Sequence, residues 1–305
     1  MLPATLATLL FSISVVCATR TAKMLGSAEA NFWRLAFAMF CLALWAHGFG
    51  VGIAGKSLPI FLLSGFIGFG VGDLALFQAL PLLGSRLSIL LVHCLAAPFA
   101  ALTEWLWLGT TLSLFQVVSS VTILAGVALA LAPSDHLKLT RRQFRTGIGF
   151  GVLAAIGQAF GAVLSRKAFA LAAATHLGID GITAAYQRIL GGMVVATFWY
   201  WWTRRGAKSE SGTIGADTPK PVAHRWRAAW PWVLLNGLTG SALGVSCFQW
   251  ALKTAPTGVV LPIVAMTPLV VIPLARVMEG EQATLRSLVG GVIAVAGVIA
   301  LTLAK

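Results

Sequence analysis

Long apolar stretches separated by short polar joints run through the whole chain. Each stretch is close to the ~20 residues that an α-helix needs to cross a bilayer. The stretches are continuously apolar, whereas the strands of an outer-membrane barrel alternate between apolar and polar positions. The pattern therefore predicts an all-α integral membrane protein with ten transmembrane helices, over residues 2–19, 30–47, 58–80, 86–107, 112–132, 147–170, 182–202, 230–252, 257–277 and 287–304.

Turn residues and charges mark the joints between these helices. Most joints are short, as at residues 81–86, so consecutive helices are expected to lie antiparallel. We expect residues 1–132 to hold five helices, residues 133–146 to form a basic connecting loop, and residues 147–305 to hold five more helices. Residues 203–229 are long, polar and mixed in charge, which predicts a mobile loop within the second half.

The two halves of the chain repeat each other. When the chain is aligned with itself so that Phe77 falls on Phe248, Gly126 falls on Gly297 in the same register. The match runs from the third to the fifth predicted helix without a gap. Apolar sequences match easily by chance, so this unbroken register carries more weight than any single identity.

The number of helices in each copy predicts how the two copies are oriented. Residues 32–34 are similar to residues 186–188, which extends the repeat to the second and seventh helices. Five helices is an odd number, so the second copy must enter the membrane from the opposite face. Such inverted repeats are typical of transporters, whose substrate site lies near the middle of the membrane between the two repeats.

Composition and charge agree with a membrane protein. Hydrophobic residues make up 58% of the chain and charged residues 10%, against roughly a half and a quarter in soluble domains. Much of the net charge of +13 lies at residues 138–145 and 204–227, in joints that flank apolar stretches. Membrane lipid is the expected partner of such joints, and nucleic acid is not needed to explain the charge.

Short motifs in both copies resemble a known family. They are residues 72–80, 84–86, Pro98 and 106–109 in the first copy, and residues 248–252, Pro268, 279–281 and Gly297 in the second. These residues resemble the EamA family of the drug/metabolite transporter superfamily, and the resemblance spans nearly the whole chain as two repeats. It implies a multi-pass carrier of the plasma (inner) membrane, often an exporter of amino acids or other small metabolites.

Two ionisable residues, Asp73 and His93, are expected near the middle of the membrane. The turn between the third and fourth helices is centred near Leu82, and both residues lie about 14–16 Å along their helices from that turn. They could touch each other, line one cavity, or form an interhelical hydrogen bond that only aids packing. If they line a cavity, they are candidates for coupling transport to protons.

Amides inside the predicted helices are candidates for contacts with substrate. Gln78 and Gln249 occupy equivalent positions of the repeat, and Gln158 lies in the middle of the sixth helix. An amide offers both a donor and an acceptor, which suits an uncharged or zwitterionic solute. The competing interpretation is that each amide joins two helices. Trp250, next to Gln249, is a further candidate.

Two arginines lie inside predicted helices. Arg34 is near a helix end, so we expect its side chain to extend to the membrane surface. Arg188 is deeper, beside Tyr186, and a guanidinium there could hold a carboxylate or a phosphate through two hydrogen bonds. Tyr186 and Arg188 therefore join the candidate binding residues.

Enzyme motifs are absent from the sequence, including zinc-protease, serine-hydrolase, Walker and dinucleotide-binding signatures. We therefore expect no catalytic residues, no metal and no cofactor. The favoured function is a secondary transporter of a small polar metabolite, such as an amino acid, that works by alternating access. An intramembrane enzyme that uses Asp73 and His93, and a passive channel or structural subunit, remain alternatives, and the oligomeric state stays open.

The basic residues also predict an orientation. Lysine and arginine gather in the joints that follow the odd-numbered helices, opposite the two termini. Basic loops face the cytoplasm, so the charges place both termini outside it. The family resemblance implies the reverse, with both termini in the cytoplasm, and our prediction follows the charges.

Overall fold

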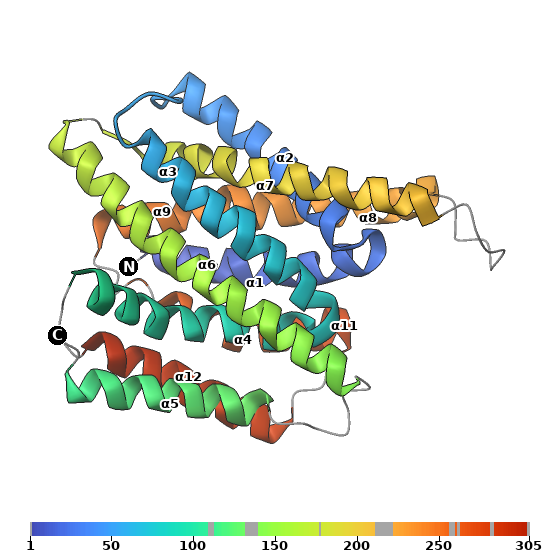
Figure 1. Ribbon diagram of the computed structural model, residues 1–305, viewed down its shortest axis with the longest axis vertical. Coiled ribbons are helices and arrows are strands. Elements are labelled where there is room, and N and C mark those ends of the chain that lie inside the picture. Colours follow the sequence, from blue (N-terminus) through green and yellow to red (C-terminus); the bar gives the residue numbers. More distant parts are fainter. Residues whose placement is uncertain are drawn as a thin grey trace.

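The computed structural model describes residues 2–108, 113–131, 140–176, 178–210, 222–255, 260, 263–280 and 284–303. Regular structure within these residues is helical throughout (Figure 1). The first half contains α1 (Leu2–Leu25), α2 (Ser27–Gly48), α3 (Leu58–Gly65), η1 (Phe66–Gly72), α4 (Asp73–Leu108) and α5 (Leu114–Leu131). The second half contains α6 (Arg141–Ala174), α7 (Gly181–Glu210), α8 (Val222–Asn236), η2 (Gly237–Gly244), α9 (Val245–Thr254), α11 (Thr267–Glu279) and α12 (Leu285–Leu303).

Each predicted stretch overlaps at least one of these helices, but two predicted loops are partly wrong. Residues 141–146 of the expected connecting loop form the start of α6, because Thr140 and Gln143 cap its first turn reciprocally. The ends of the expected loop at 203–229 also belong to helices, since α7 continues to Glu210 and α8 begins at Val222. Alanine, lysine and arginine favour helix beyond the apolar stretch, where hydrophobicity alone gives no signal. Residues 133–139 and 211–221 lie outside the described residues.

The turn predicted at residues 81–86 lies inside the element α4. Gly84 has φ of +78° and ψ of 172°, so two helices meet there. The helix before Gly84 is continuous with η1 and α3, and the helix after it turns back. A positive φ is tolerated by glycine, which has no Cβ, and is strained for most other residues.

Two π-helical segments occupy equivalent places in the two halves. In the first half, η1 ends immediately before Asp73, and in the second half, η2 ends immediately before Val245. Aligning η1 with η2 at these ends, one residue away from the register that places Phe77 on Phe248, puts Gly68 on Gly240 and Gly72 on Gly244. Short π-helical turns inside α-helices are frequent at functional sites.

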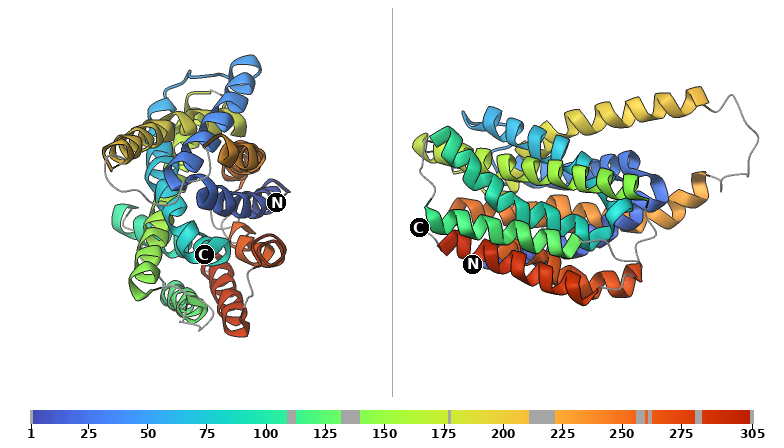
Figure 2. Two further views of the ribbon diagram at one scale, coloured as in Figure 1. Left: turned by 90° about the vertical axis from the view of Figure 1, so that its right-hand side faces the viewer. Right: turned by 60° about the horizontal axis from the view of Figure 1, so that its bottom comes forward.

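All the helices run roughly along one direction, and the two termini lie at the same end of the bundle (Figures 1 and 2). At one side, α5 and α12 pack closely against each other. A Cβ added to Gly126 would lie 2.5 Å from the Ala294 nitrogen, and one added to Gly297 would lie 3.1 Å from the Ile123 nitrogen. The register of the repeat that relates Gly126 to Gly297 also relates Ile123 to Ala294, so these two contacts are reciprocal.

The contacts of Gly290 fix the relative direction of these two helices. A Cβ on Gly290 would lie 2.5 Å from the Ala130 nitrogen. Moving along α5 from Ile123 to Ala130 therefore means moving backward along α12 from Gly297 to Gly290. The last helices of the two halves are antiparallel and contact each other through equivalent residues.

Among the described residues, three helical stretches are long and apolar enough to cross a membrane by length and composition: Leu2–Leu25, Leu58–Ala100 and Arg141–Ala174. Shorter apolar helices cover Val117–Ala130, Thr267–Met278 and Leu285–Ala300.

Candidate functional site

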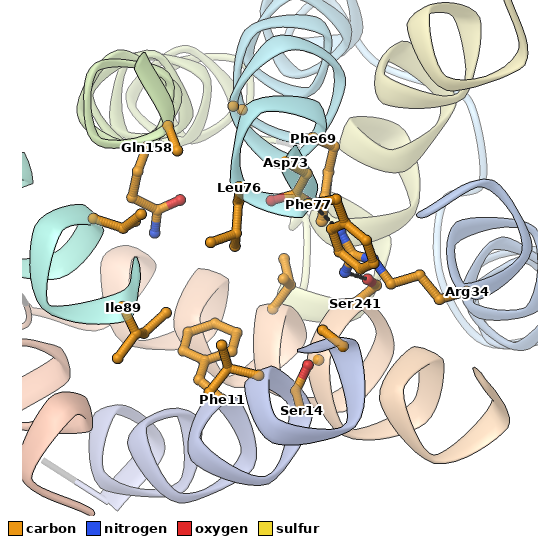
Figure 3. Close-up of a pocket in the computed structure, with 18 of the residues that line it drawn as sticks. Phe11, Ser14, Arg34, Phe69, Asp73, Leu76, Phe77, Ile89, Gln158 and Ser241 are labelled. Atoms are coloured by element: carbon orange, nitrogen blue, oxygen red, sulfur yellow. Dashed lines mark hydrogen bonds and ion pairs between the residues drawn. The ribbon is translucent and has the colours of Figure 1, made fainter. Parts of the chain in front are cut away.

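A cavity lies at the centre of the bundle, between helices of both halves (Figure 3). Its volume is about 80 Å³. This volume is below the ~300–1,000 Å³ that binding sites for small molecules usually measure. Its walls come from α1, α2, η1, α4, α6, α7, α8, η2 and α9.

One wall of the cavity carries an ion pair between a buried arginine and a partly buried aspartate. Arg34 of α2 donates from Nη2 to the Asp73 carboxylate, and from Nη1 to the Ser241 hydroxyl at 2.5 Å. Its Nε and Nη2 also donate to Asn31 Oδ1 at 3.1 and 2.9 Å. Asp73 directly follows η1 and Ser241 lies within η2, so this one guanidinium joins the π-helical segments of both halves.

A second arginine, Arg188 of α7, lies on the same cavity and is only 4% exposed. Its guanidinium carbon is 5.3 Å from the centre of the Phe69 ring. Within the described part of the chain, the buried Nε of Arg188 has no hydrogen-bond partner. A Cβ on Gly68 would lie 2.9 Å from Arg188 Nη2, so the glycine at this position leaves room for the guanidinium.

His93 and Gln158 complete the polar lining that the sequence predicted. His93 Nδ1 is 3.1 Å from the Val264 carbonyl oxygen, and Phe11 packs edge-on against the imidazole. Gln158 points from α6 into the cavity (Figure 3). Of the three arrangements considered for Asp73 and His93, the structure has the one in which both line one cavity. The ion-pair partner of Asp73 is Arg34.

Four predicted site residues lie away from the cavity lining. Gln78 is half-buried further along α4, and Gln249 is fully buried among helices. The Tyr186 hydroxyl is 3.1 Å from His47 Nε2, on α2. Trp250 is 49% exposed and faces outward from α9. Helix periodicity explains the difference, because neighbours in sequence point to different faces of one helix.

The sequence interpretation missed Arg34 as a site residue. It predicted that the side chain reaches the membrane surface, but Arg34 is 5% exposed and points into the bundle. The signal was the similarity of residues 32–34 to residues 186–188, which pairs Arg34 with the deep Arg188. Ser14 and Asn236, which hydrogen-bond each other at 2.7 Å on the cavity wall, were also missed. A lone Ser or Asn inside a helix gives no sequence signal for such a pair.

The arrangement suits recognition of a charged or polar solute. Two guanidiniums and one carboxylate share a small cavity, with the Gln158 amide opposite and the aromatic rings of Phe11, Phe77 and Phe248 around them. In the described residues, no three His, Cys, Asp or Glu side chains meet as a metal site would require.

Comparison with known proteins identifies the family of this chain. The EamA-like transporter family matches residues 1–132 and 145–303. A solved crystal structure of a protein shares the fold, with a TM-score of 0.56 and 16% identity, over 97% of this chain and 96% of that chain. No curated protein matches. Two matched segments on an all-helical, strongly apolar chain confirm the resemblance seen in the sequence, and the protein is a multi-pass membrane protein that belongs to the EamA-like transporter family of the drug/metabolite transporter superfamily.

Proposed function

We propose that this protein is a secondary transporter that moves a small polar metabolite, such as an amino acid, by alternating access. In this proposal, ten helices cross the plasma (inner) membrane as two inverted five-helix repeats. The central cavity opens in turn to each side of the membrane, and Asp73, Arg188, His93 and Gln158 contact the substrate or a coupling ion.

The observation that carries this proposal is the guanidinium of Arg34, which forms an ion pair within the first half and a hydrogen bond to the second half. Arg34 contacts Asp73 after η1 and Ser241 within η2. A movement of its guanidinium would therefore act on both π-helical segments. Transporters with inverted repeats place substrate sites at the repeat interface, on helices interrupted near the middle of the membrane.

Exchanged helix contacts between the halves support alternating access. Gly72 of η1 packs on Gly157 of α6, and Gly244 of η2 packs on Phe11 of α1. Each half thus holds its π-helical segment against the first helix of the other half. Rocking of one half against the other would move both segments around the same cavity.

A flux assay in liposomes tests the proposal. Purified protein is reconstituted, the vesicles are loaded with radiolabelled amino acids and small organic acids, and efflux is followed after dilution. We expect efflux of at least one solute above protein-free vesicles, retained in Arg204→Gln, an exposed arginine outside the cavity. Absence of flux for every solute, with correctly folded protein, would contradict the carrier function.

We further propose that protons drive the transport, through Asp73 and His93. Asp73 is paired with Arg34, and both candidate groups line the same cavity as Arg188, so protonation of the carboxylate would release Arg34 from its partner. Asp73→Asn keeps the size and hydrogen bonding of the side chain but removes its charge. The variant should retain counterflow exchange and lose accumulation driven by a pH gradient. If it concentrates substrate with the same pH dependence as the wild type, the coupling role is wrong.

A further inference from the structure

Because the chain contains two repeats, each arginine of the cavity can be compared with the equivalent arginine of the other repeat. We treat Arg34 and Arg188 as equivalent, because residues 32–34 are similar to residues 186–188 and share the arginine. Their backbones are also placed alike. A Cβ on Gly237 would lie 2.8 Å from the Arg34 carbonyl oxygen, and one on Gly65 would lie 1.7 Å from the Arg188 carbonyl oxygen. Aligned at their last residues, η1 and η2 place Gly65 on Gly237, one residue away from the register that places Phe77 on Phe248.

The hydrogen-bond partners of the two arginines differ at every equivalent position. Arg34 bonds Asn31, three residues before it, where Arg188 has Ala185. Arg34 bonds Ser241 in η2, where η1 has Phe69 when the two segments are aligned at their ends and Gly70 in the register of Phe77 and Phe248. Arg34 pairs with Asp73, the first residue after η1, whereas Val245 follows η2. The second repeat therefore holds an arginine in the same place with each of these three partners replaced by an apolar residue.

A buried guanidinium without hydrogen bonds is costly, because its donors lose water and gain no replacement. Arg188 is more than nine-tenths buried, and its Nε is unpartnered within the described residues. Its guanidinium lies over the Phe69 ring and interacts electrostatically with Asp73, which is already paired with Arg34. An aromatic ring beside the flat face of a guanidinium leaves the N–H groups at its edge free. Such a fork matches the two oxygens of a carboxylate.

The charges around the cavity specify the charge of the ligand. Arg34 and Asp73 neutralise each other as a pair, and Arg188 adds one positive charge. His93 can only add to this positive charge. A solute with one net negative charge would balance the cavity, whereas a neutral zwitterion would leave it positive.

We propose that Arg188 is the subsite for the carboxylate of a solute that carries one net negative charge, such as a small monocarboxylate or an acidic amino acid. The proposal rests on the transporter function proposed above and narrows its substrate. The Arg34–Asp73 pair holds the cavity in shape, and Arg188 is the arginine left open for the ligand.

Thermal stability of the detergent-purified protein provides the test. The probes are the straight-chain carboxylates from acetate to octanoate, together with phenylacetate and glutamate. Phenethylamine and phenyl phosphate serve as a cation and a dianion with the same ring as phenylacetate. We expect at least one carboxylate to raise the Tm and phenethylamine to leave it unchanged. Stabilisation by phenyl phosphate alone, or by no carboxylate, would overturn the proposal.

Two variants separate binding at Arg188 from general stabilisation. In Arg188→Gln the Tm without ligand should rise, because an unpaired buried charge is removed, and the carboxylate shift should disappear. Ala185→Asn gives Arg188 the partner that Arg34 has, and it should reduce the carboxylate shift while keeping the guanidinium. Arg204→Gln, the matched control outside the cavity, should bind as the wild type does. A carboxylate shift that survives in Arg188→Gln would place the ligand elsewhere.

The same carboxylate in the liposome flux assay distinguishes failure of the subsite from failure of the transporter function. Binding that depends on Arg188, without flux, would support the subsite and contradict the carrier. Flux that persists in Arg188→Gln would support the carrier and contradict the subsite.

Discussion

At the scale of single residues, charge burial decides how the cavity is built. A guanidinium and a carboxylate taken out of water must pair closely or cost several kcal/mol each. Arg34 and Asp73 solve this together, since each is the other's ion-pair partner and Asn31 and Ser241 hold the rest of the guanidinium. The stability of this cavity wall therefore depends on these four side chains together.

A double-mutant cycle on Arg34 and Asp73 tests this interdependence. Arg34→Gln alone leaves Asp73 without its partner, and Asp73→Asn alone leaves a buried guanidinium. We expect each single change to lower the free energy of unfolding by about 3 kcal/mol. The double variant should be clearly more stable than the sum of the two losses predicts.

Chemical denaturation of the protein in mixed micelles gives these free energies. Additive losses would show that the two charges do not depend on each other in the folded state. Ser241→Ala is a useful companion, because it removes one hydrogen bond to Arg34 and leaves the charges in place.

The sequence identified part of this site. Asp73, His93, Gln158 and Arg188 were found because a polar group in the middle of an apolar stretch is unusual, and all four line the cavity. Arg34 was misplaced because its distance from the helix end was counted on a stretch that began at residue 30. The helix itself begins at Ser27, which puts Arg34 deeper. Direction around a helix was also ambiguous for Gln249 and Trp250, since apolar residues surround them on every face.

At the scale of helices, glycines set how closely the two halves approach. On α12, Gly290 and Gly291 are neighbours with different surroundings. A Cβ on Gly290 would lie 2.5 Å from the Ala130 nitrogen of α5, whereas a Cβ on Gly291 would meet only Leu90 Cδ1, at 3.9 Å. The repeat register in the sequence predicted that Gly126 and Gly297 are equivalent, but not that their helices touch.

Alanine at these two neighbouring positions should have opposite effects. Gly290→Ala must separate two backbones, and we expect a loss of about 1–3 kcal/mol of stability. Gly291→Ala has room and removes a flexible glycine from a helix, so it should be neutral or stabilise by up to about 1 kcal/mol. Melting of the two purified variants side by side checks this, and equal melting temperatures would contradict the close contact of α5 and α12.

The π-helical segment η1 offers a test that separates function from stability. In Gly68→Ala the new Cβ would lie 2.9 Å from Arg188 Nη2, at the far end of a flexible side chain. The guanidinium should shift at little cost, so we expect a nearly unchanged Tm and a loss of flux of about tenfold or more. Gly149→Ala is the matched control, because its Cβ meets nothing within 4 Å. A flux equal to that of Gly149→Ala would show that the position of Arg188 does not matter.

At the scale of the whole molecule, the bundle has two unlike ends. The termini share one end, and the ends of α7 and α8 nearest residues 211–221 extend from the other (Figure 2). That second end carries Arg204, Arg205, Arg225 and Arg227, and α6 begins there with Arg141. The sequence predicted this separation of charge from the spacing of helices alone, because each crossing reverses the chain.

The unequal ends predict the orientation in the membrane. Since basic ends are retained in the cytoplasm, both termini should face away from it. A reporter that is active only outside the cytoplasm, fused after Lys305, should be active, and one that works only in the cytoplasm should be silent. The same reporters inserted within residues 211–221 should give the opposite pattern. Activity of the cytoplasmic reporter at Lys305 would overturn this orientation.

The unbalanced charge of the cavity also connects the transport cycle to the voltage across the membrane. One elementary charge moved through 100 mV changes the free energy by ~2.3 kcal/mol. A cavity filled with an anion is neutral and would change its open side without sensing that field. The empty cavity keeps the positive charge of Arg188, so a negative cell interior would favour the state that opens to the cytoplasm. The empty protein would then mainly open its cavity to the cytoplasm, which is the side from which an exporter takes up its solute.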